Sequence, residues 1–290
     1  MQLTYFEKGF NFSQDGPGNR LVYHLQGCNM HCPWCANPEG IPLVGPLVVD
    51  SARLVDEVCP YGAIADGQLD RSRCETCSDR PCLTDMRNQG ILAKAVSIDI
   101  ESVWSEILRS SPMYFAGGGV TFTGGEASLQ LDAVLELMKR CREHAISTAI
   151  ETNGTNPRLP ELFPWLDHLI MDVKHGSSER LMAVAGQPLK NIAANLKAAA
   201  EAGLNVLVRI PIIGGFNTSE QDKKEFIDFM ERFDKSRIRI ECLRFHEYGV
   251  KKWVAIGQEY ALDESARVSK KQIAEWQEAL RSAGWQVTTT

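Results

Sequence analysis

The 290-residue sequence predicts an α/β fold in which parallel strands alternate with crossover helices. Short apolar runs alternate with segments of helical periodicity, and nearly every apolar run ends in a polar, charged or glycine-containing loop. The hydrophobic share of 44% is also large enough for one sizeable core, alone or with a small insert. Six strand and helix units of this kind would form an open (β/α)6 barrel, a partial TIM-like barrel.

Six short apolar runs are the predicted strands of this barrel. They lie at 21–26, 120–123, 147–151, 168–173, 206–213 and 238–243. Functional groups of such barrels gather where the strands end, on the loops that lead into the helices. The loops after the first four runs and the sixth carry CNMHCPWC, GGE, ETNG, DVK and FHEYG, so we expect one mouth to receive them all.

Four stretches have the apolar spacing of amphipathic helices. They lie at 100–108, 131–141, 191–202 and 269–282. Gly203 and Gly284 follow the last two and are plausible helix stops. Cys141 and Cys242 fall inside apolar periodic segments, and we interpret them as small buried hydrophobes without a chemical role.

The net charge of −6 and the scattered basic residues give no electrostatic footprint for nucleic acid. There is no apolar run of about eighteen residues, and the amino terminus lacks the basic and apolar regions of an export signal. We therefore expect a soluble cytoplasmic protein without a membrane partner. Seven of the nine cysteines precede residue 83, and in a reducing compartment such clusters bind metal more often than they form disulfides.

The run CNMHCPWC contains Cys28, Cys32 and Cys35 and is the most informative motif. A [4Fe–4S] cluster held by protein alone takes four thiolates, so three would leave one iron open to a small molecule. Thiolates also bind zinc, but a closed zinc site needs a fourth ligand, and His31 would have to point back between the cysteines to supply it. We favour the iron–sulfur cluster.

Residues 43–97 interrupt the alternation of strands and helices, and we predict an inserted module there, with 1–42 and 98–290 forming the barrel. The cysteines of this insert are Cys59, Cys74, Cys77 and Cys82. A CxxC pair and a Cys-Pro are typical of ferredoxin loops, which predicts a small ferredoxin-like module with one accessory [4Fe–4S] cluster. Four cysteines can also make a closed zinc site, which stays open as the alternative.

The CX3CX2C spacing, with DGPGNR at 15–20 and CANPE at 35–39, resembles the glycyl-radical-enzyme activating enzymes of the radical S-adenosylmethionine (SAM) superfamily. The resemblance to these enzymes, of which the pyruvate formate-lyase activases are the best known, extends to about His246. It implies that a reduced cluster passes one electron to SAM, which breaks the bond between sulfur and the 5′-carbon and gives methionine and a 5′-deoxyadenosyl radical. That radical would take a hydrogen from the α-carbon of one glycine in a partner glycyl radical enzyme.

The resemblance also implies roles at the barrel mouth. Gly124, Gly125 and Glu126 would hold the amino group of SAM, although glycines and an acidic residue at such a turn can serve capping alone. Trp34 occupies the position that the family places against the adenine, with plain packing as the alternative. Arg209 and His246 match further family positions beside SAM.

Lys174 would be a SAM ligand by the same resemblance. Asp172, Glu151 and Thr152 would lie near a monovalent cation, although Glu151 stands where the pyruvate formate-lyase activases have Asp. Asp172 and Lys174 are two residues apart at a strand end and share a face, so a structural ion pair is the alternative for them.

The insert lies beside the barrel mouth in the sequence, which predicts that it relays electrons from a flavodoxin or ferredoxin, or shapes the surface that receives the partner enzyme. The family leads us to expect a monomer. Three rival functions remain. They are a radical SAM enzyme acting on a small molecule, a non-catalytic iron–sulfur electron carrier and a zinc-stabilised interaction protein. Production of 5′-deoxyadenosine separates the enzymes from the carrier, and iron analysis addresses the zinc protein.

Overall fold

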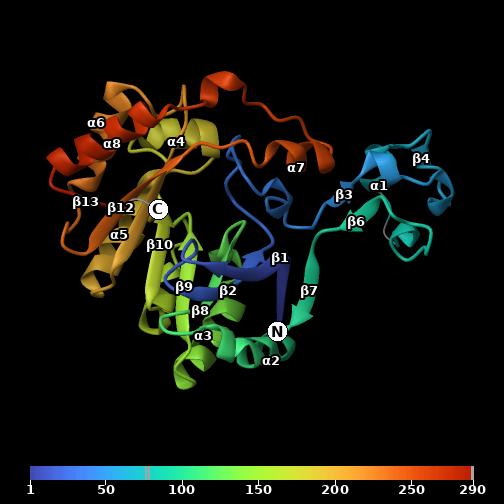
Figure 1. The fold of residues 1–290 in the computed structure, drawn as a ribbon, viewed down its shortest axis with the longest axis horizontal. Coiled ribbons are helices and arrows are strands. Elements are labelled where there is room, and N and C mark those ends of the chain that lie inside the picture. The colour runs from blue at the N-terminus through green and yellow to red at the C-terminus, as the bar shows by residue number, and fades with distance from the viewer. Residues whose placement is uncertain (76, 78, 289–290) are drawn as a thin grey trace.

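The computed structural model describes residues 1–75, 77 and 79–288. Its main body is a nine-stranded sheet with the order β13-β12-β11-β10-β9-β8-β2-β1-β7 (Figure 1). From β13 to β2 all neighbours pair in parallel, and β1 and β7 add antiparallel strands at one edge. The strands are β1 (Gln2–Phe12), β2 (Asn19–Leu25), β7 (Val96–Asp99), β8 (Gly119–Gly124), β9 (Ser147–Thr152), β10 (His168–Asp172), β11 (Val206–Ile212), β12 (Ile238–Arg244) and β13 (Gln286–Thr288).

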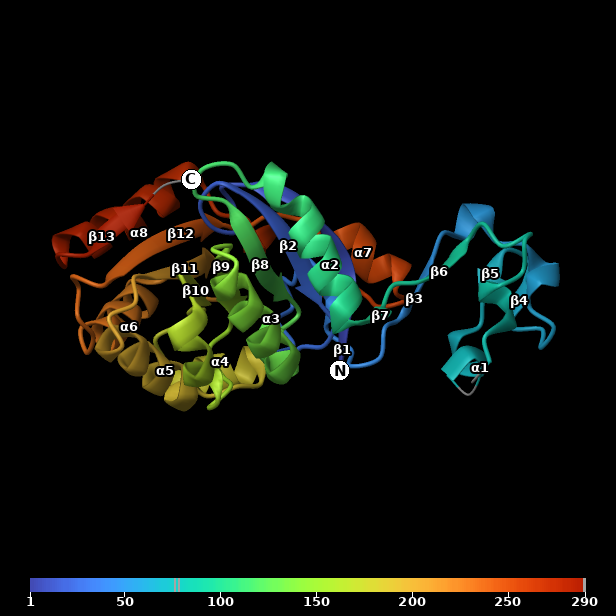
Figure 2. The same cartoon turned by 90° about the horizontal axis from the view of Figure 1, so that it is seen from below.

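Helices cover the outer face of the curved sheet (Figure 2). They are α2 (Ile100–Ser110), α3 (Leu131–Glu143), α4 (Ser178–Ala185), α5 (Leu189–Glu201), α6 (Glu220–Met230) and α8 (Lys270–Ser282). The side chains of Ser219 and Ser269 cap α6 and α8, each in a reciprocal capping box. None of the helices in the described ranges combines the length and the apolar character needed to cross a bilayer.

The open α/β barrel and the six predicted strands are confirmed, with boundaries within two residues of those expected. All four predicted helices are also present, and Cys141 and Cys242 are buried. The sheet is nevertheless larger than six strands. The prediction missed β1 because its hairpin with β2 does not follow the strand and helix alternation, and it missed β7 and β13 because each has no more than four residues.

The two faces of the sheet differ in chemistry. On the outer face, Val120, Phe122 and Ile150 are completely buried beneath the helices, where each contributes about 1.5–3 kcal/mol of hydrophobic stabilisation. On the inner face the alternate positions are polar, among them Thr121 on β8 and Arg209 on β11. Because successive strand residues point to opposite faces, this alternation builds an apolar shell around a polar interior.

The loop between β1 and β2 enters this polar interior. The hydroxyl of Thr121 donates to the backbone oxygen of Asp15 at 2.6 Å, and Arg209 donates to the backbone oxygen of Gln14. Gly16 has φ +118° in this loop, a conformation that favours glycine. The loop separates an upper cavity from a lower cavity, and no described residue lines both.

The segment after the cysteine loop leaves the main sheet and forms a small unit to one side (Figure 1). Its elements are β3 (Leu47–Val49), β4 (Ile64–Ala65), β5 (Gln68–Leu69), α1 (Arg71–Glu75) and β6 (Ile91–Ala93). The unit has a small core of its own, formed by Leu47, Val58, Ile64, Cys82 and Ile91. The chain returns to the main sheet at Val96, which pairs with Tyr5 of β1.

Helix α7 (Val250–Ala255) lies between the main sheet and this unit in both views (Figures 1 and 2). The guanidinium of Arg71 donates to the backbone oxygens of Leu47 at 2.9 Å and Ala255 at 2.7 Å. Arg71 therefore joins the small unit to the end of α7.

Candidate functional site

The carboxyl ends of the parallel strands surround an upper cavity of about 300 Å³. The loops after β2, β8, β9, β10, β11 and β12 all contribute to its lining. Most of the residues predicted to act at the mouth are among the lining residues. These are Cys28, Cys32, Cys35, Trp34, Gly124, Gly125, Glu151, Thr152, Asp172, Lys174 and His246.

Backbone hydrogen bonds hold the cysteine loop in place. The N–H of Cys28 donates to the oxygen of Ile41 at 3.0 Å, and the N–H of Cys35 donates to the oxygen of Cys32 at 3.0 Å. The N–H of Met30 also donates to Sγ of Cys28 at 3.4 Å. A hydrogen bond to sulfur favours the thiolate, which is the form that binds a metal.

The three thiols fit an iron–sulfur cluster. Burial raises the pKa of each, to about 12 for Cys28 and Cys35, so they stay protonated at neutral pH until a metal replaces the protons. His31, which a closed zinc site would need, is exposed and lies outside the cavity lining, and its N–H donates to Ala185 at the end of α4. Three soft donors without His31 are the set expected for a cluster with one open iron.

Gly124 and Gly125 form a wall of the cavity beside the cysteine loop. The N–H of Gly125 donates to the oxygen of Leu25 at 2.8 Å, and the next N–H donates to the oxygen of Gly27 at 2.7 Å. A Cβ on Gly125 would overlap the oxygens of Gly27 and Gly40. Only glycine therefore allows the turn after β8 to approach the cysteine loop this closely.

Glu126 differs from the prediction because its side chain does not line the cavity. Its carboxylate caps the 3₁₀ helix Ala127–Gln130, accepting the N–H of Ser128 at 2.9 Å. It also accepts the hydroxyl of Thr152 at 2.6 Å and the N–H of Asn153 at 2.6 Å. Four strong donors, counting the Ser128 hydroxyl, hold this buried carboxylate, so in this structure Glu126 makes the contacts of a cap, and its contact with SAM stays a prediction.

Lys174 and Asp172 form the ion pair that the sequence analysis gave as the alternative for them. The ammonium of Lys174 donates to Asp172 at 2.9 Å, and both side chains line the cavity. The Lys174 side chain is nine-tenths buried, which places a fixed positive charge close to the cysteine loop.

Glu151 is the third charged group of this wall. It accepts a hydrogen bond from the hydroxyl of Thr123 at 2.9 Å and pairs with Arg209 at 2.5 Å. Burial, with the charges of Asp172 and Asp15, raises the pKa of Glu151 to about 7, against the lowering effect of Arg209.

Arg209 also differs from the prediction, since it lines the lower cavity rather than the upper one. Its guanidinium lies between Glu151 and Glu241, which it contacts at 2.8 Å. The two carboxylates and the loop between β1 and β2 hold it behind the cavity wall. Arg209 is linked to the lining of the upper cavity through its ion pair with Glu151.

The sequence analysis missed several residues of the cavity. Asp15 and His24 line it, and Asp15 could have been found because it opens the DGPGNR motif. Burial lowers the pKa of both His24 and His246, which keeps the two rings neutral at pH 7. Asn153 of ETNG also lines the cavity, and its side chain donates to Asn29 of the cysteine loop at 2.9 Å.

Helix α7 supports the cysteine loop from behind, which no sequence signal indicated. The indole N–H of Trp253 donates to the backbone oxygen of Cys35 at 3.0 Å. The ammonium of Lys252 donates to the side-chain oxygen of Asn37 at 2.6 Å.

The four cysteines of the small unit line one shared cavity, together with Leu47 and Tyr61. These are Cys59, Cys74, Cys77 and Cys82. The N–H of Ala63 donates to Sγ of Cys59 at 3.3 Å. Burial first, and then the neighbouring thiols, raise the pKa of Cys74 and Cys82.

Comparison with known proteins gives a consistent result. Residues 22–230 match the family model of the radical SAM superfamily. The chain is 32% identical over 268 residues to the isethionate sulfite-lyase activating enzyme of Desulfovibrio desulfuricans, covering 86% of this chain and 85% of that protein. It is 33% identical over 266 residues to the (2S)-3-sulfopropanediol sulfolyase activating enzyme of Bilophila wadsworthia, covering 86% of this chain and 87% of that protein.

Among solved structures, a radical SAM methyltransferase from Sphaerobacter thermophilus matches with a TM-score of 0.56 at 13% identity. The match covers 97% of this chain and 68% of that one. At this identity the likeness shows a shared fold alone.

Proposed function

The chain belongs to the radical SAM superfamily and, within it, to the glycyl-radical-enzyme activating enzymes, and from this premise we propose how its residues carry out the reaction. The enzyme is an oxidoreductase that cleaves SAM reductively and removes a hydrogen from a glycine of a partner glycyl radical enzyme. The observation that supports the site is the single cavity in which three cysteines, paired glycines and a buried lysine meet.

We propose that Cys28, Cys32 and Cys35 hold a [4Fe–4S] cluster and that SAM binds its open iron. When bound, the cluster supplies the electron for cleavage of SAM, and SAM supplies the group that accepts the hydrogen. Lys174 would pair with the carboxylate of SAM, and the backbone of Gly124 and Gly125 would receive its amino group. The protein's contribution is to orient these groups and to keep other hydrogen donors away.

The adenosine half would lie between Trp34 and His246, which contribute flat faces to the same cavity. His246 stacks on Tyr248 with ring centroids 4.2 Å apart, which limits its rotation. Glu126 and Arg209 are proposed to act indirectly, because the first fixes the ETNG loop and the second fixes Glu151.

The direct test combines the reduced enzyme, SAM and its partner glycyl radical enzyme, which the neighbouring genes should identify, under anaerobic conditions. A glycine-centred doublet in the electron paramagnetic resonance spectrum and 5′-deoxyadenosine are the expected products. Lys174→Met should reduce both signals, whereas the exposed Lys271→Met should not. Formation of 5′-deoxyadenosine without the doublet would favour a small-molecule substrate.

We propose that residues 43–97 act as a separate module that binds one accessory [4Fe–4S] cluster through Cys59, Cys74, Cys77 and Cys82. Support comes from their shared cavity and from the small core of this unit. Iron, sulfide and zinc should be measured in the wild type and in the double variant Cys74→Ala and Cys77→Ala. A loss of about four irons supports the cluster, whereas the loss of one zinc supports the structural alternative.

This module would receive electrons from a flavodoxin or ferredoxin. The double variant should then cleave SAM with a chemical reductant but fail with the protein reductant. Loss of both activities, with the barrel cluster still loaded, would contradict the relay role.

A monovalent cation near Asp172, Glu151 and Thr152 is a further proposal, supported by the excess of carboxylates beside the cavity. SAM affinity should then be higher in potassium or sodium than in tetramethylammonium at equal ionic strength. Equal affinities in the two salts would contradict a bound cation. Lys174 and Arg209, which pair with Asp172 and Glu151, would then be sufficient to balance these carboxylates.

We also propose a monomer that works in the cytoplasm, where its unpaired thiols stay reduced.

A further inference from the structure

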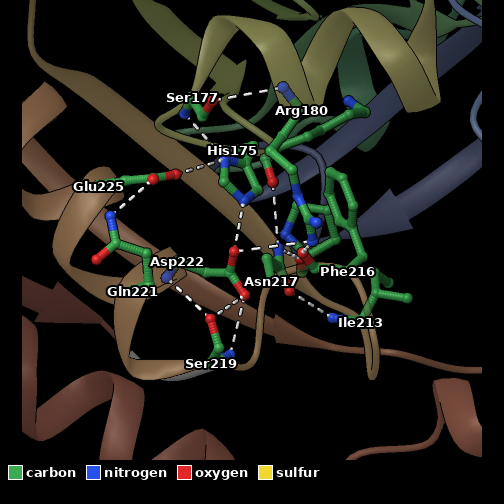
Figure 3. Close-up of polar contacts among 12 residues, drawn as sticks. His175, Ser177, Arg180, Ile213, Phe216, Asn217, Ser219, Gln221, Asp222 and Glu225 are labelled. Carbon is green, nitrogen blue, oxygen red and sulfur yellow. Dashed lines mark hydrogen bonds and ion pairs between the residues drawn. The ribbon is translucent and has the colours of Figure 1, made fainter.

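A polar network around His175, Asp222 and Asn217 (Figure 3) adjoins the upper cavity, because Asn217 contacts Lys174 of the cavity lining. His175 follows Lys174 in the chain, but its ring points away from the cavity and is completely buried. Nδ1 of His175 accepts the N–H of Ser177 at 2.8 Å, so the ring proton lies on Nε2. Nε2 then donates to Asp222 at 3.1 Å.

This network is not a metal site, although atoms of His175, Asp222 and Glu225 lie within 4.8 Å of one another. Both nitrogens of the ring are already used, one as an acceptor and one as a donor, so neither offers a free lone pair. Burial lowers the pKa of His175, which keeps this neutral arrangement at pH 7. The two hydrogen bonds of the His175 ring therefore stabilise the structure, and the ring does not act as a metal ligand.

Asp222 joins this ring to the next structural unit. Its second oxygen accepts the N–H of Ser219 at 3.0 Å and the Ser219 hydroxyl at 2.6 Å, in the capping box of α6. The loop that follows β10 is thereby tied to the beginning of the helix that follows β11.

Asn217 makes a second connection between the same two strands. Its side-chain N–H groups donate to the backbone oxygens of Lys174 at 3.1 Å and Pro211 at 2.8 Å, and its oxygen accepts the N–H of Ile213 at 2.8 Å. Asn217 is almost fully buried, and Lys174, Pro211 and Ile213 all line the upper cavity. The side-chain amide of Asn217 thus fixes the distance between the ends of β10 and β11 at the upper cavity.

Phe216 carries the network to the other side of the cavity. Its ring lies 5.2 Å from the ring of His175 and 4.6 Å from the indole of Trp34, measured between centroids. Arg180 covers the ring and donates to the backbone oxygen of Phe216 (Figure 3). The position of Trp34 therefore depends on the same network as that of Lys174.

We propose that His175 and Asn217 are positioning residues that hold Lys174 and Trp34 at the separation required to bind the two ends of SAM. The inference rests on the proposed roles of Lys174 and Trp34 in SAM binding. It goes beyond them because neither His175 nor Asn217 lines the cavity.

The test compares two ligands, SAM and decarboxylated SAM, which lacks the carboxylate proposed to pair with Lys174. His175→Leu removes the donor to Asp222, whereas His175→Gln retains an N–H donor near the position of Nε2. We expect His175→Leu to weaken SAM binding about five- to ten-fold, with less than about two-fold change for decarboxylated SAM. His175→Gln should restore most of the affinity.

Dissociation constants should be measured on the cluster-loaded protein by anaerobic equilibrium dialysis. The change in the electron paramagnetic resonance spectrum of the reduced cluster on ligand addition provides a second readout. Iron content and thermal unfolding show whether each variant is folded. If His175→Leu does not fold, Asn217→Ser, which keeps a hydroxyl donor, is used in the same comparison.

Lys174→Met separates the two ways in which the inference can fail. If Lys174→Met selectively weakens SAM but His175→Leu weakens both ligands equally, or neither, the positioning role is wrong while the proposed site stands. If Lys174→Met changes the affinities for SAM and decarboxylated SAM by the same factor, the proposed role of Lys174 is wrong. The positioning role of His175 and Asn217 is then wrong as well.

Discussion

The indole N–H of Trp253 donates a hydrogen bond to the backbone oxygen of Cys35 at 3.0 Å, although 218 positions separate the two residues in the chain. Trp253→Phe removes this donor and keeps an aromatic ring. Because one such bond contributes about 1 kcal/mol, we expect a chelator to remove iron from the loaded protein about five-fold faster. Trp276→Phe is the control, since that indole N–H has no hydrogen-bond partner among the described residues. Equal rates in the two variants would contradict the prediction.

Arg209→Met should destabilise the protein strongly. The side chains of Arg209 and Glu241 are more than nine-tenths buried, and Glu151 also depends on this guanidinium. Removing the cation leaves two carboxylates in the interior without the guanidinium that pairs with both, at a cost of about 3–5 kcal/mol in the free energy of unfolding. Urea unfolding should show this loss.

A triple variant that adds Glu151→Gln and Glu241→Gln provides the matched control. Neutral amides do not require the guanidinium, so we expect part of the stability to return. Arg158→Met, which breaks only exposed ion pairs, should change stability by less than about 1 kcal/mol.

Gly125→Ala should separate the GGE turn from the cysteine loop. The added Cβ would overlap backbone oxygens on both sides, so the turn has to move, at a cost of about 1–3 kcal/mol. Equilibrium dialysis of the loaded variant should show loss of SAM binding. Gly9→Ala in β1 meets open space and should leave both stability and binding unchanged.

Arg71→Met should loosen the small unit without unfolding the barrel. The side chain of Arg71 joins Leu47 to Ala255, so its loss frees the unit from the end of α7. Hydrogen exchange should become faster in peptides from 43–97 and stay unchanged in those from β8 and β9. Arg53→Met is the control, because Arg53 is two-thirds exposed. Unchanged exchange in both variants would mean that other contacts hold the unit.

Stability should fall when the solution is acidified below about pH 6.5. Burial lowers the pKa of four histidines, namely His24, His168, His175 and His246. At these four histidines the unfolded chain binds protons in this window that the folded protein does not, so acid favours unfolding, and their full contribution is present above the ordinary histidine pKa. The raised pKa of Glu151 acts in the opposite direction, but it is one group against four. Urea midpoints of the cluster-free protein should decrease between about pH 7 and pH 5.5.

His175→Gln removes one of these titrations and should make the pH profile shallower. A flat wild-type profile over this range would contradict the prediction.

The barrel could be predicted because its strands are short apolar runs and each motif directly follows one of them. The run at 120–123 and the GGE after it show this, since Gly124 and Gly125 line the cavity as expected. For these residues the order of strand and motif along the chain was sufficient to predict their place, because parallel strands bring their carboxyl ends to one edge of the sheet.

The rest of the site depends on contacts between residues that are far apart in the sequence, and a local sequence pattern does not predict such contacts. Whether Glu126 faces a ligand or a cap is decided by donors from Thr152 and Asn153 on a neighbouring loop. Arg209 sits behind the cavity because Glu241 on the next strand contacts it. Trp253 belongs to a short helix late in the chain, and only the folded structure brings it to Cys35.

The loop between β1 and β2 gives the barrel a floor, because it lies across the interior between the upper and lower cavities. Among the described residues, the upper cavity is therefore reached from the carboxyl ends of the strands and not by way of the lower cavity. A glycine at the tip of a turned segment fits this geometry, since both ends of the segment can stay outside the opening.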